Sequence, residues 1–185
     1  RLFSPRAQGT LSQTLEDTTV RTSLATVDSP FQIDRKKDSF AIGVLDFKLT
    51  EPFFRSTTQV NGTATMSAGT VTLNVINPGS VEERDPVITY IGPLNNPVIT
   101  NPLNSHTLSY AGSIAATVVV QTASTGEFTA LAGTTNVIGN ITHSGGAALM
   151  VLNSGGTTNG TNALSITNAG GTTGKVIVSF YPPYL

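Results

Sequence analysis

Short segments rich in β-branched and aromatic residues recur along most of this chain, separated by turn residues at intervals of about eight to twelve residues. The turns are clusters of Gly, Asn, Pro and Ser, such as "GPLNNP", "NSGGTTNGTN" and "NAGGTTG". No window of about ten residues carries the 3.6-residue period of an amphipathic helix. This pattern predicts an all-β protein, an antiparallel two-sheet sandwich of jelly-roll or Greek-key topology with an extended N-terminal arm.

The clearest strand is "SFAIGVLDFKL", in which Phe40, Ile42 and Val44 alternate before the parity changes at Leu45. That change predicts a β-bulge beside Gly43. The runs "TTQVNGTATM" and "TVTLNVINPGS" predict a hairpin in which Gly69 supplies the turn conformation. Further strands are expected at residues 86–90, 97–100, 107–111, 114–122, 127–131, 136–141, 147–152, 163–167 and 175–181.

Two parts of the chain differ in pattern. Residues 1–38 have scattered apolar positions and no sustained period, so we expect an extended arm with a short strand within "TVRTSLATV" and a solvated loop at "DRKKD". Residues 39–185 are expected to form a single β-sandwich domain. The consecutive prolines of the ending "FYPPYL" stop the last strand, because proline cannot donate to a ladder.

Charge is nearly absent from the second half of the chain. Of the 10 Lys+Arg and 11 Asp+Glu residues, only Glu127 and Lys175 lie between Val87 and Leu185, and the net charge is -1. Such a chain offers no basic face, which argues against a nucleic-acid partner. A neutral Ser/Thr/Asn surface loses little on desolvation, so copies of the chain itself are the expected partners. Few tryptic sites and no Cys or Trp suit an extracellular or particle surface.

Candidate nucleophiles and bases are sparse. The chain has no Cys, which excludes disulfides and thiolate chemistry. Ser105 precedes His106 and Ser144 follows His143, but no Gly-x-Ser-x-Gly elbow aims a nucleophile. We therefore expect no enzyme activity and no catalytic residues.

Cofactor and metal motifs also fail. The stretch "GGTTGKV" departs from the P-loop spacing, and Val176 stands where a Mg²⁺ ligand belongs. The acids Glu82, Glu83 and Asp85 surround Arg84 in a turn, which we interpret as a solvated loop rather than a Ca²⁺ site. The expected cofactor and metal content is none, and no apolar run approaches the roughly 20 residues of a membrane span.

A family resemblance rests on residues 101–122 and 172–181, which contain "SHTLSY", a small-residue corner, "IAATVVVQT" and "TTGKVIVSFY". This pattern resembles the jelly-roll subunits of bacterial endospore appendage fibres, and viral jelly-roll coat and decoration proteins are similar in the same way. The resemblance implies polymerisation by β-augmentation and a short N-terminal connector. The best-known fibre subunits carry cysteines in that connector, so covalent cross-linking is not expected here.

The leading hypothesis is a structural, non-enzymatic subunit that self-assembles through strand or arm exchange into an extracellular filament or surface layer. The alternative is a virion capsid, decoration or tail-fibre protein with a jelly-roll fold; a cell, spore or virion surface is then a further expected partner. A glycan- or receptor-binding sandwich ranks below both, because the chain has no Trp for a sugar platform. The residues expected at the assembly interface are Phe3, Leu11, Leu15, Ile114, Val118, Val120, Tyr181 and Tyr184.

Overall fold

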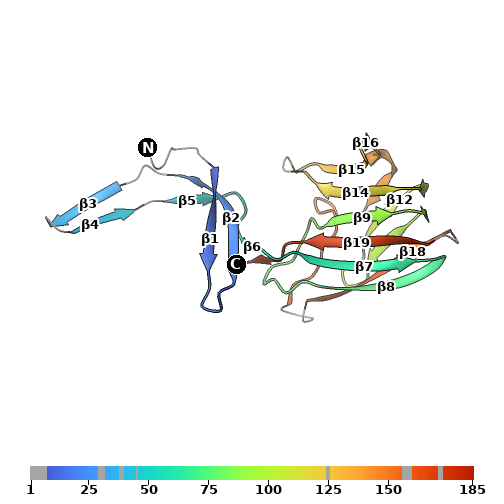
Figure 1. Ribbon diagram of the computed structural model, residues 1–185, viewed down its shortest axis with the longest axis horizontal. Helices are drawn as coiled ribbons and strands as arrows, with labels where there is room; N and C mark the ends of the chain where they lie inside the picture. The colour runs from blue at the N-terminus through green and yellow to red at the C-terminus, as the bar shows by residue number, and fades with distance from the viewer. Residues whose placement is uncertain are drawn as a thin grey trace. The chain divides into compact units, whose positions relative to one another are not determined.

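The structure is a computed structural model, and it describes residues 8–28, 32–37, 40–44, 46–123, 126–155, 160–170 and 173–185, with the backbone alone at 32–37 and 40–44 (Figure 1). The chain divides into two compact units. One contains Arg1–Thr57 and Tyr184–Leu185, and the other contains Thr58–Pro183. This boundary lies later in the chain than the one expected after residue 38.

The second unit contains two antiparallel sheets that form a sandwich (Figure 1). The six-stranded sheet has the order β16-β15-β14-β9-β19-β7. Its strands are β7 (Val60–Met66), β9 (Val87–Ile91), β14 (Thr117–Thr122), β15 (Phe128–Ala132), β16 (Thr135–Asn136) and β19 (Gly174–Phe180).

The five-stranded sheet has the order β17-β12-β11-β18-β8. Its strands are β8 (Gly69–Ile76), β11 (Val98–Asn101), β12 (His106–Tyr110), β17 (Ile141–His143) and β18 (Thr161–Asn168). A small separate pair joins β10 (Leu94–Asn95) to β13 (Ser113–Ile114), and the 3₁₀ turn η1 (Ile138–Asn140) precedes β17.

The strand pairings are nested along the chain. Strand β11 pairs with β12, β9 with β14, β8 with β18, and β7 with β19, all antiparallel. The nested pairs alternate between the two sheets, so the chain winds as a double ribbon around one core. This is the eight-stranded jelly roll with two Greek keys. It confirms the predicted all-β sandwich, and β15, β16 and β17 extend the two sheets between β14 and β18.

The core lies between the two sheets because alternate residues of each strand point inward. Strands β7 and β19 show this directly, with buried and more exposed positions alternating along each. The fully buried centre includes Tyr90, Ile99, Leu164 and Val178. Period-2 patterning in the sequence therefore indicates which residues of β7 and β19 face the core.

The predicted hairpin of β7 and β8 is wrong. Gly69 does have a positive φ of 106°, as expected for a turn. However, β7 pairs with β19 in one sheet and β8 pairs with β18 in the other, so the turn carries the chain across the sandwich. Gly62 of β7 allows close approach there: a Cβ on it would lie 2.7 Å from Cγ2 of Val75.

Two other predicted strands are absent from the structure. Residues 136–141 run from the last residue of β16 through the 3₁₀ turn to the first residue of β17. Residues 147–152 are irregular, with a single antiparallel bridge between Leu152 and Glu83. Five consecutive residues of this segment, Ala148 to Leu152, are buried. Their apolar run reflects burial on all sides rather than a strand.

The N-terminal unit is also built from strands. Its main sheet has the order β1-β2-β6-β20, and β5 also pairs with β2. These strands are β1 (Gln8–Thr14), β2 (Val20–Val27), β5 (Phe47–Leu49), β6 (Phe54–Ser56) and β20 (Pro183–Tyr184), of which Pro183 is counted with the second unit. A second hairpin joins β3 (Gln32–Lys37) to β4 (Phe40–Val44).

Three local expectations change in this unit. The segment expected as an extended arm contains the β1–β2 hairpin over Gln8–Val27. Asp34 to Lys37, expected in a solvated loop, belong to strand β3. The strand expected over "SFAIGVLDFKL" is divided into β4 and β5, and the register shift lies in β3 between Arg35 and Lys37 rather than beside Gly43.

Candidate assembly surface in the N-terminal unit

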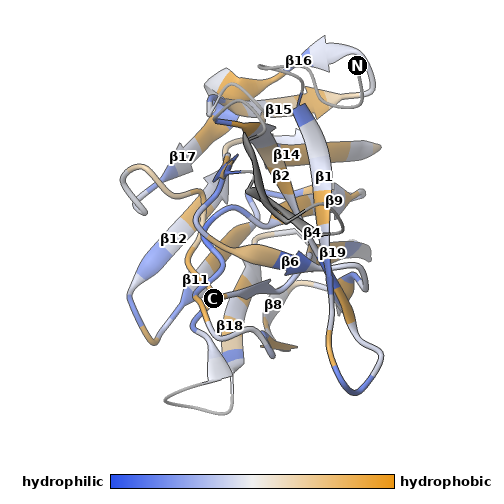
Figure 2. Ribbon diagram, turned by 90° about the vertical axis from the view of Figure 1, so that its left-hand side faces the viewer, coloured by the Kyte–Doolittle hydropathy of each residue, from blue (hydrophilic) through white to orange (hydrophobic). Residues whose placement is uncertain are grey.

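Strand β1 is exposed on both faces. Six of its seven residues are exposed, and only Leu11 is partly buried. Figure 2 shows blue to white colours along most of β1, with a short orange stretch. β1 pairs with β2 through seven register positions, from Gln8↔Thr26 to Thr14↔Val20. Its other edge has no strand partner among the described residues.

Strands β5 and β6 lie in sequence along the opposite edge of β2. Ala25 pairs with Leu49, and Thr22 pairs with Arg55. Three positions separate the two β2 residues (25 − 22 = 3), whereas six separate their partners (55 − 49 = 6), so three extra residues bulge out between β5 and β6. A bulge of this kind re-aims nearby side chains. Here it carries Glu51 beside the sheet.

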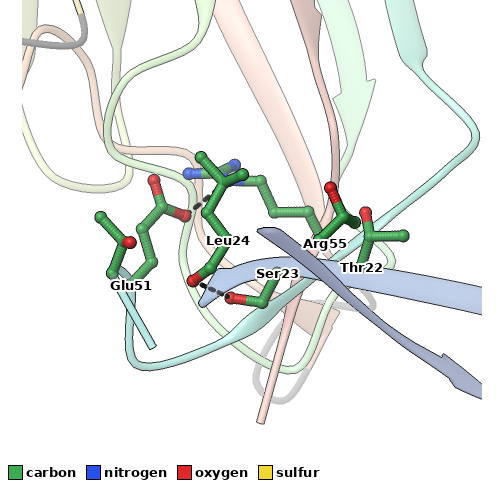
Figure 3. A pocket seen from close by; sticks show the side chains of 7 residues that line it. Thr22, Ser23, Leu24, Glu51 and Arg55 are labelled. Atoms are coloured by element: carbon green, nitrogen blue, oxygen red, sulfur yellow. Dashed lines mark hydrogen bonds and ion pairs between the residues drawn. The ribbon is translucent and has the colours of Figure 1, made fainter. Parts of the chain in front are cut away.

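The bulge forms one side of an open pocket of about 210 Å³ (Figure 3). Nε of Arg55 donates to Oε2 of Glu51 at 2.9 Å. Leu24 is 52% exposed in this pocket, which is large exposure for an apolar side chain within a sheet. The other lining residues are Thr10, Thr22, Ser23 and Thr50.

Few side chains are buried in the part of the N-terminal unit whose side chains the structure describes, residues 8–28, 46–57 and 184–185. Only Ser23 and Ala25 are buried among them, at 7% and 5% exposure. An aromatic contact supplies part of the packing, because the guanidinium of Arg21 lies 3.6 Å from the ring centroid of Tyr184. The β1–β2 turn is held by Asp17, which accepts a hydrogen bond from the backbone N–H of Thr19 at 2.9 Å. Hydrogen bonds from the Thr19 side chain and backbone hold the pKa of Asp17 below its usual value.

The predicted interface residues occupy different places. Phe3 lies outside the described residues. Leu11 is in β1 and Leu15 is in the following turn, both partly buried. Tyr184 is in β20 against Arg21, whereas Tyr181 is 44% exposed in the jelly-roll unit. The structure therefore brings Leu11, Leu15 and Tyr184 into one unit.

The other three predicted interface residues are core residues. Ile114 is 2% exposed, Val118 is 3% exposed and Val120 is fully buried. Strand β14 pairs with β9 on one side and β15 on the other, so this segment is not a sheet edge. Their side chains pack inside the jelly roll and offer no surface to a neighbour in this conformation.

A second open pocket of about 310 Å³ lies in the jelly-roll unit, lined by Glu82, Arg84, Asn104, His106, Gly145, Ala147, Ala148, Val151 and Asn153. Nδ1 of His106 is buried without a hydrogen-bond partner. Arg84 donates to Glu82, so the charges at this pocket neutralise one another. His143 packs edge-on against Phe128 at 4.5 Å, and the Ser144 hydroxyl accepts from the backbone N–H of Thr107 at 2.9 Å.

Two of the three acidic residues in the turn before Pro86, Glu83 and Asp85, have structural roles. Glu83 is 2% exposed and accepts from the backbone N–H of Asp85 at 2.9 Å. Asp85 accepts from the backbone N–H of Leu149 at 3.1 Å and from the Thr122 hydroxyl at 2.9 Å. The expected solvated loop describes Glu82 but not Glu83. Over the described ranges, no group of three or more His, Cys, Asp or Glu residues is placed to hold a metal ion.

Sequence reasoning missed Leu24, Glu51 and Arg55. Leu24 shares the parity of Thr22 and Thr26 in "TVRTSLATV", a stretch that predicted a strand there but not which face it would show. The pairing of Glu51 with Arg55 depends on the bulge between β5 and β6. In the described part of the chain, no helix is long and apolar enough to cross a membrane.

Comparison with known proteins gives one structural neighbour to report. No family model matches the chain, and no curated protein matches it. Among solved structures, the chain is similar to the SPP1 Dit (gp 19.1) protein, described as a paradigm of hub adsorption apparatus in Gram-positive infecting phages. The identity is 14%, the match covers 90% of this chain and 67% of that chain, and the TM-score is 0.48.

Proposed function

We propose that this protein is a structural, non-enzymatic subunit of a multi-copy particle, a virion capsid, decoration or tail protein. The N-terminal unit supplies contacts between copies, and the jelly roll forms the body of the subunit. The expected location is the surface of the particle.

One observation carries the proposal: strand β1 is exposed on both faces and along one edge in the part of the chain that the structure describes. Small isolated sheets are marginally stable in water unless a hydrophobic face is covered. The jelly roll has a large buried core of its own, whereas β1, β2, β5 and β6 of the N-terminal unit bury only Ser23 and Ala25. The N-terminal unit therefore gains most from a partner.

The jelly-roll topology adds an analogy at the level of the fold. Two-sheet jelly rolls are common in viral capsid and lectin domains and in cupins. A lectin uses exposed aromatic residues to stack sugars, and the only exposed large aromatics found over the described ranges are Phe47 and Tyr181, which come from different units. A cupin needs a cluster of metal-binding residues, and the described part of the chain contains no group of three or more His, Cys, Asp or Glu residues placed for one. The capsid-like role fits this composition best, and it is supported by analogy of fold.

An extracellular filament subunit is the second candidate. An unpaired strand edge without charge or proline can accept a strand from another chain, and β1 has neither. Closed and open assemblies can use the same edge. Their difference lies in the rotation between neighbouring copies.

Negative-stain electron microscopy of the purified full chain, with mass by light scattering over a range of concentrations, tests the proposal. Shells, rings or discrete oligomers support the particle subunit. Filaments support the second candidate instead. A monomer at every concentration contradicts both functions, because neither operates as a single copy.

A further inference from the structure

We propose that β1 is a homotypic docking strand, pairing antiparallel with β1 of a second copy across a two-fold axis at Leu11. This inference rests on the proposed function and names the surface that performs it.

Strand β1 lacks the protection that sheet edges normally carry. Residues 8–15, "QGTLSQTL", contain no charge and no proline, the usual devices that keep edges from pairing. The jelly-roll edge strands β7 and β8 are also uncharged, but alternate residues of both are buried in the core. β1 has no such anchorage, since six of its residues are exposed.

Acidic residues beside β1 determine the orientation of the partner strand. The β1–β2 turn carries Glu16 and Asp17 directly after the uncharged segment. Parallel pairing of two β1 strands in register would place these acids beside their own copies, and like charges directly opposite are destabilising. Antiparallel pairing moves the two acidic turns to opposite ends of the ladder. Charge therefore selects the antiparallel arrangement.

The register of the paired β1 strands is centred on Leu11. With Leu11 on the axis, Leu11 meets Leu11 of the second copy, Thr10 meets Ser12, and Gln8 meets Thr14. Every opposed pair is then apolar with apolar or polar with polar, except where Gln13 faces Gly9. The Thr–Ser pairs can hydrogen-bond across the strands. An isologous contact of this kind is the commonest geometry of a homodimer.

The pairing also sets which side chains share a face of the extended sheet. Thr10 pairs with Leu24 in β2, and Leu11 pairs with Ser23. Across the axis, the more buried face becomes the row Ser23–Leu11–Leu11–Ser23, so Leu11 gains apolar cover. The opposite face keeps the pocket around Leu24 open. The proposal therefore uses Leu11 and leaves Leu24 free of the contact.

Cross-linking gives the decisive test, because the chain has no native cysteine. In antiparallel strands, directly opposed Cα atoms lie about 4.5–5.5 Å apart, within the range of a disulfide. We expect Leu11→Cys to form a covalent dimer on mild oxidation of the full chain. Gln13→Cys, in the same strand and on the same face, places its two copies roughly 14 Å apart in this register and should cross-link about tenfold less.

A charge variant tests the same contact without a cross-linking reaction. Leu11→Lys places two ammonium groups at the axis and should raise the dissociation constant of the assembly at least about tenfold. Leu24→Lys is the matched control, because Leu24 is exposed and lies outside the contact. Circular dichroism and thermal unfolding of each variant in reductant confirm that the chain still folds.

The outcomes separate this inference from the proposed function. Assembly of the parent chain with equal cross-linking of Leu11→Cys and Gln13→Cys overturns the β1 pairing and leaves the particle subunit standing. Assembly blocked by Leu24→Lys but not by Leu11→Lys also overturns it, and assigns the contact to the pocket. A parent chain that remains monomeric contradicts both proposals.

Discussion

The Asn101 side-chain amide donates to Oδ1 of Asn162 at 3.2 Å inside the jelly roll, where both residues are fully buried. Asn101 also donates to the carbonyl of Val151 at 2.8 Å, and Asn162 also accepts from the backbone N–H of Asn153 at 2.8 Å. These two side-chain amides therefore link β11 and the start of β18 to the irregular 148–152 segment and the residue that follows it. Neutral amides hold these buried segments together by hydrogen bonds, and burying them costs less desolvation free energy than burying charged side chains.

Replacing Asn162 tests this network. Asn162→Ala removes four hydrogen bonds, to the Asn101 side chain, the N–H and carbonyl of Asn153 and the carbonyl of Gly160, so the free energy of unfolding should fall by about 3 kcal/mol. Denaturant unfolding measures the change. Asn74→Ala, at an exposed position of β8, should change stability little, and equal losses from the two variants would contradict a structural role specific to Asn162.

Tyr90 and Tyr110 provide a second contrast. The hydroxyl of Tyr90 is buried without a hydrogen-bond partner, whereas that of Tyr110 accepts from Nδ2 of Asn140 at 3.0 Å. Tyr90→Phe should leave the free energy of unfolding unchanged or raise it, because it removes an unpaired polar group. Tyr110→Phe should lower it by about 1 kcal/mol. The opposite ranking in chemical denaturation would refute the assignment.

Tyr90 also predicts a loss of stability at alkaline pH. Burial raises the pKa of Tyr90 well above its usual value of 10.0, so the folded protein keeps the proton that the unfolded chain loses. Stability from this group is present below about pH 10 and falls above it by up to about 1.4 kcal/mol per pH unit. Unfolding curves at pH 9, 10 and 11 should show a steeper decline for the parent than for Tyr90→Phe.

Gly160 is a position where only glycine fits. Its φ is +69°, and a Cβ added there would lie 2.0 Å from the carbonyl oxygen of Asn77. Gly160→Ala should lower the free energy of unfolding by at least about 2 kcal/mol through the clash and the left-handed backbone. Gly139→Ala meets nothing within 4 Å and should be nearly neutral in the same thermal melts.

The Arg21–Tyr184 contact stabilises the N-terminal unit locally. Tyr184→Ala removes the ring from the guanidinium, and a loss of about 1 kcal/mol should speed amide hydrogen exchange in β2 about fivefold. Tyr184→Phe keeps the ring and should retain protection. If both variants exchange alike, the ring contact contributes nothing to the sheet.

Much of the fold was predictable because strand patterns are local. Segments such as 87–91 and 174–180 alternate inward and outward residues, and their strands appear almost where the pattern places them. The failures have a different physical origin. The 148–152 segment looks like a strand because every residue in it is apolar, and apolar runs also mark chain that is buried on all sides.

The candidate site was less predictable. Leu11, Leu15 and Tyr184 could be selected from the sequence as apolar or aromatic residues near the ends of the chain. Val118 and Val120 were expected in an edge segment, yet they lie in the core, because the residues of a strand do not show how many neighbouring strands it has. Likewise Glu83 has a typical loop context in sequence, yet tertiary folding buries it beside Leu152.

The sequence by itself determined the all-β class, the positions of most jelly-roll strands and the scarcity of charge beyond Pro86, where only Glu127 and Lys175 are charged, since each follows from composition or a period of two. Only the tertiary structure decided that β7 and β8 belong to opposite sheets, that Asn101 and Asn162 meet, and that β1 has an open edge among the described strands. Those outcomes depend on which strands pair across long stretches of chain. Pairing is a property of the whole core, because every strand competes for the same neighbours.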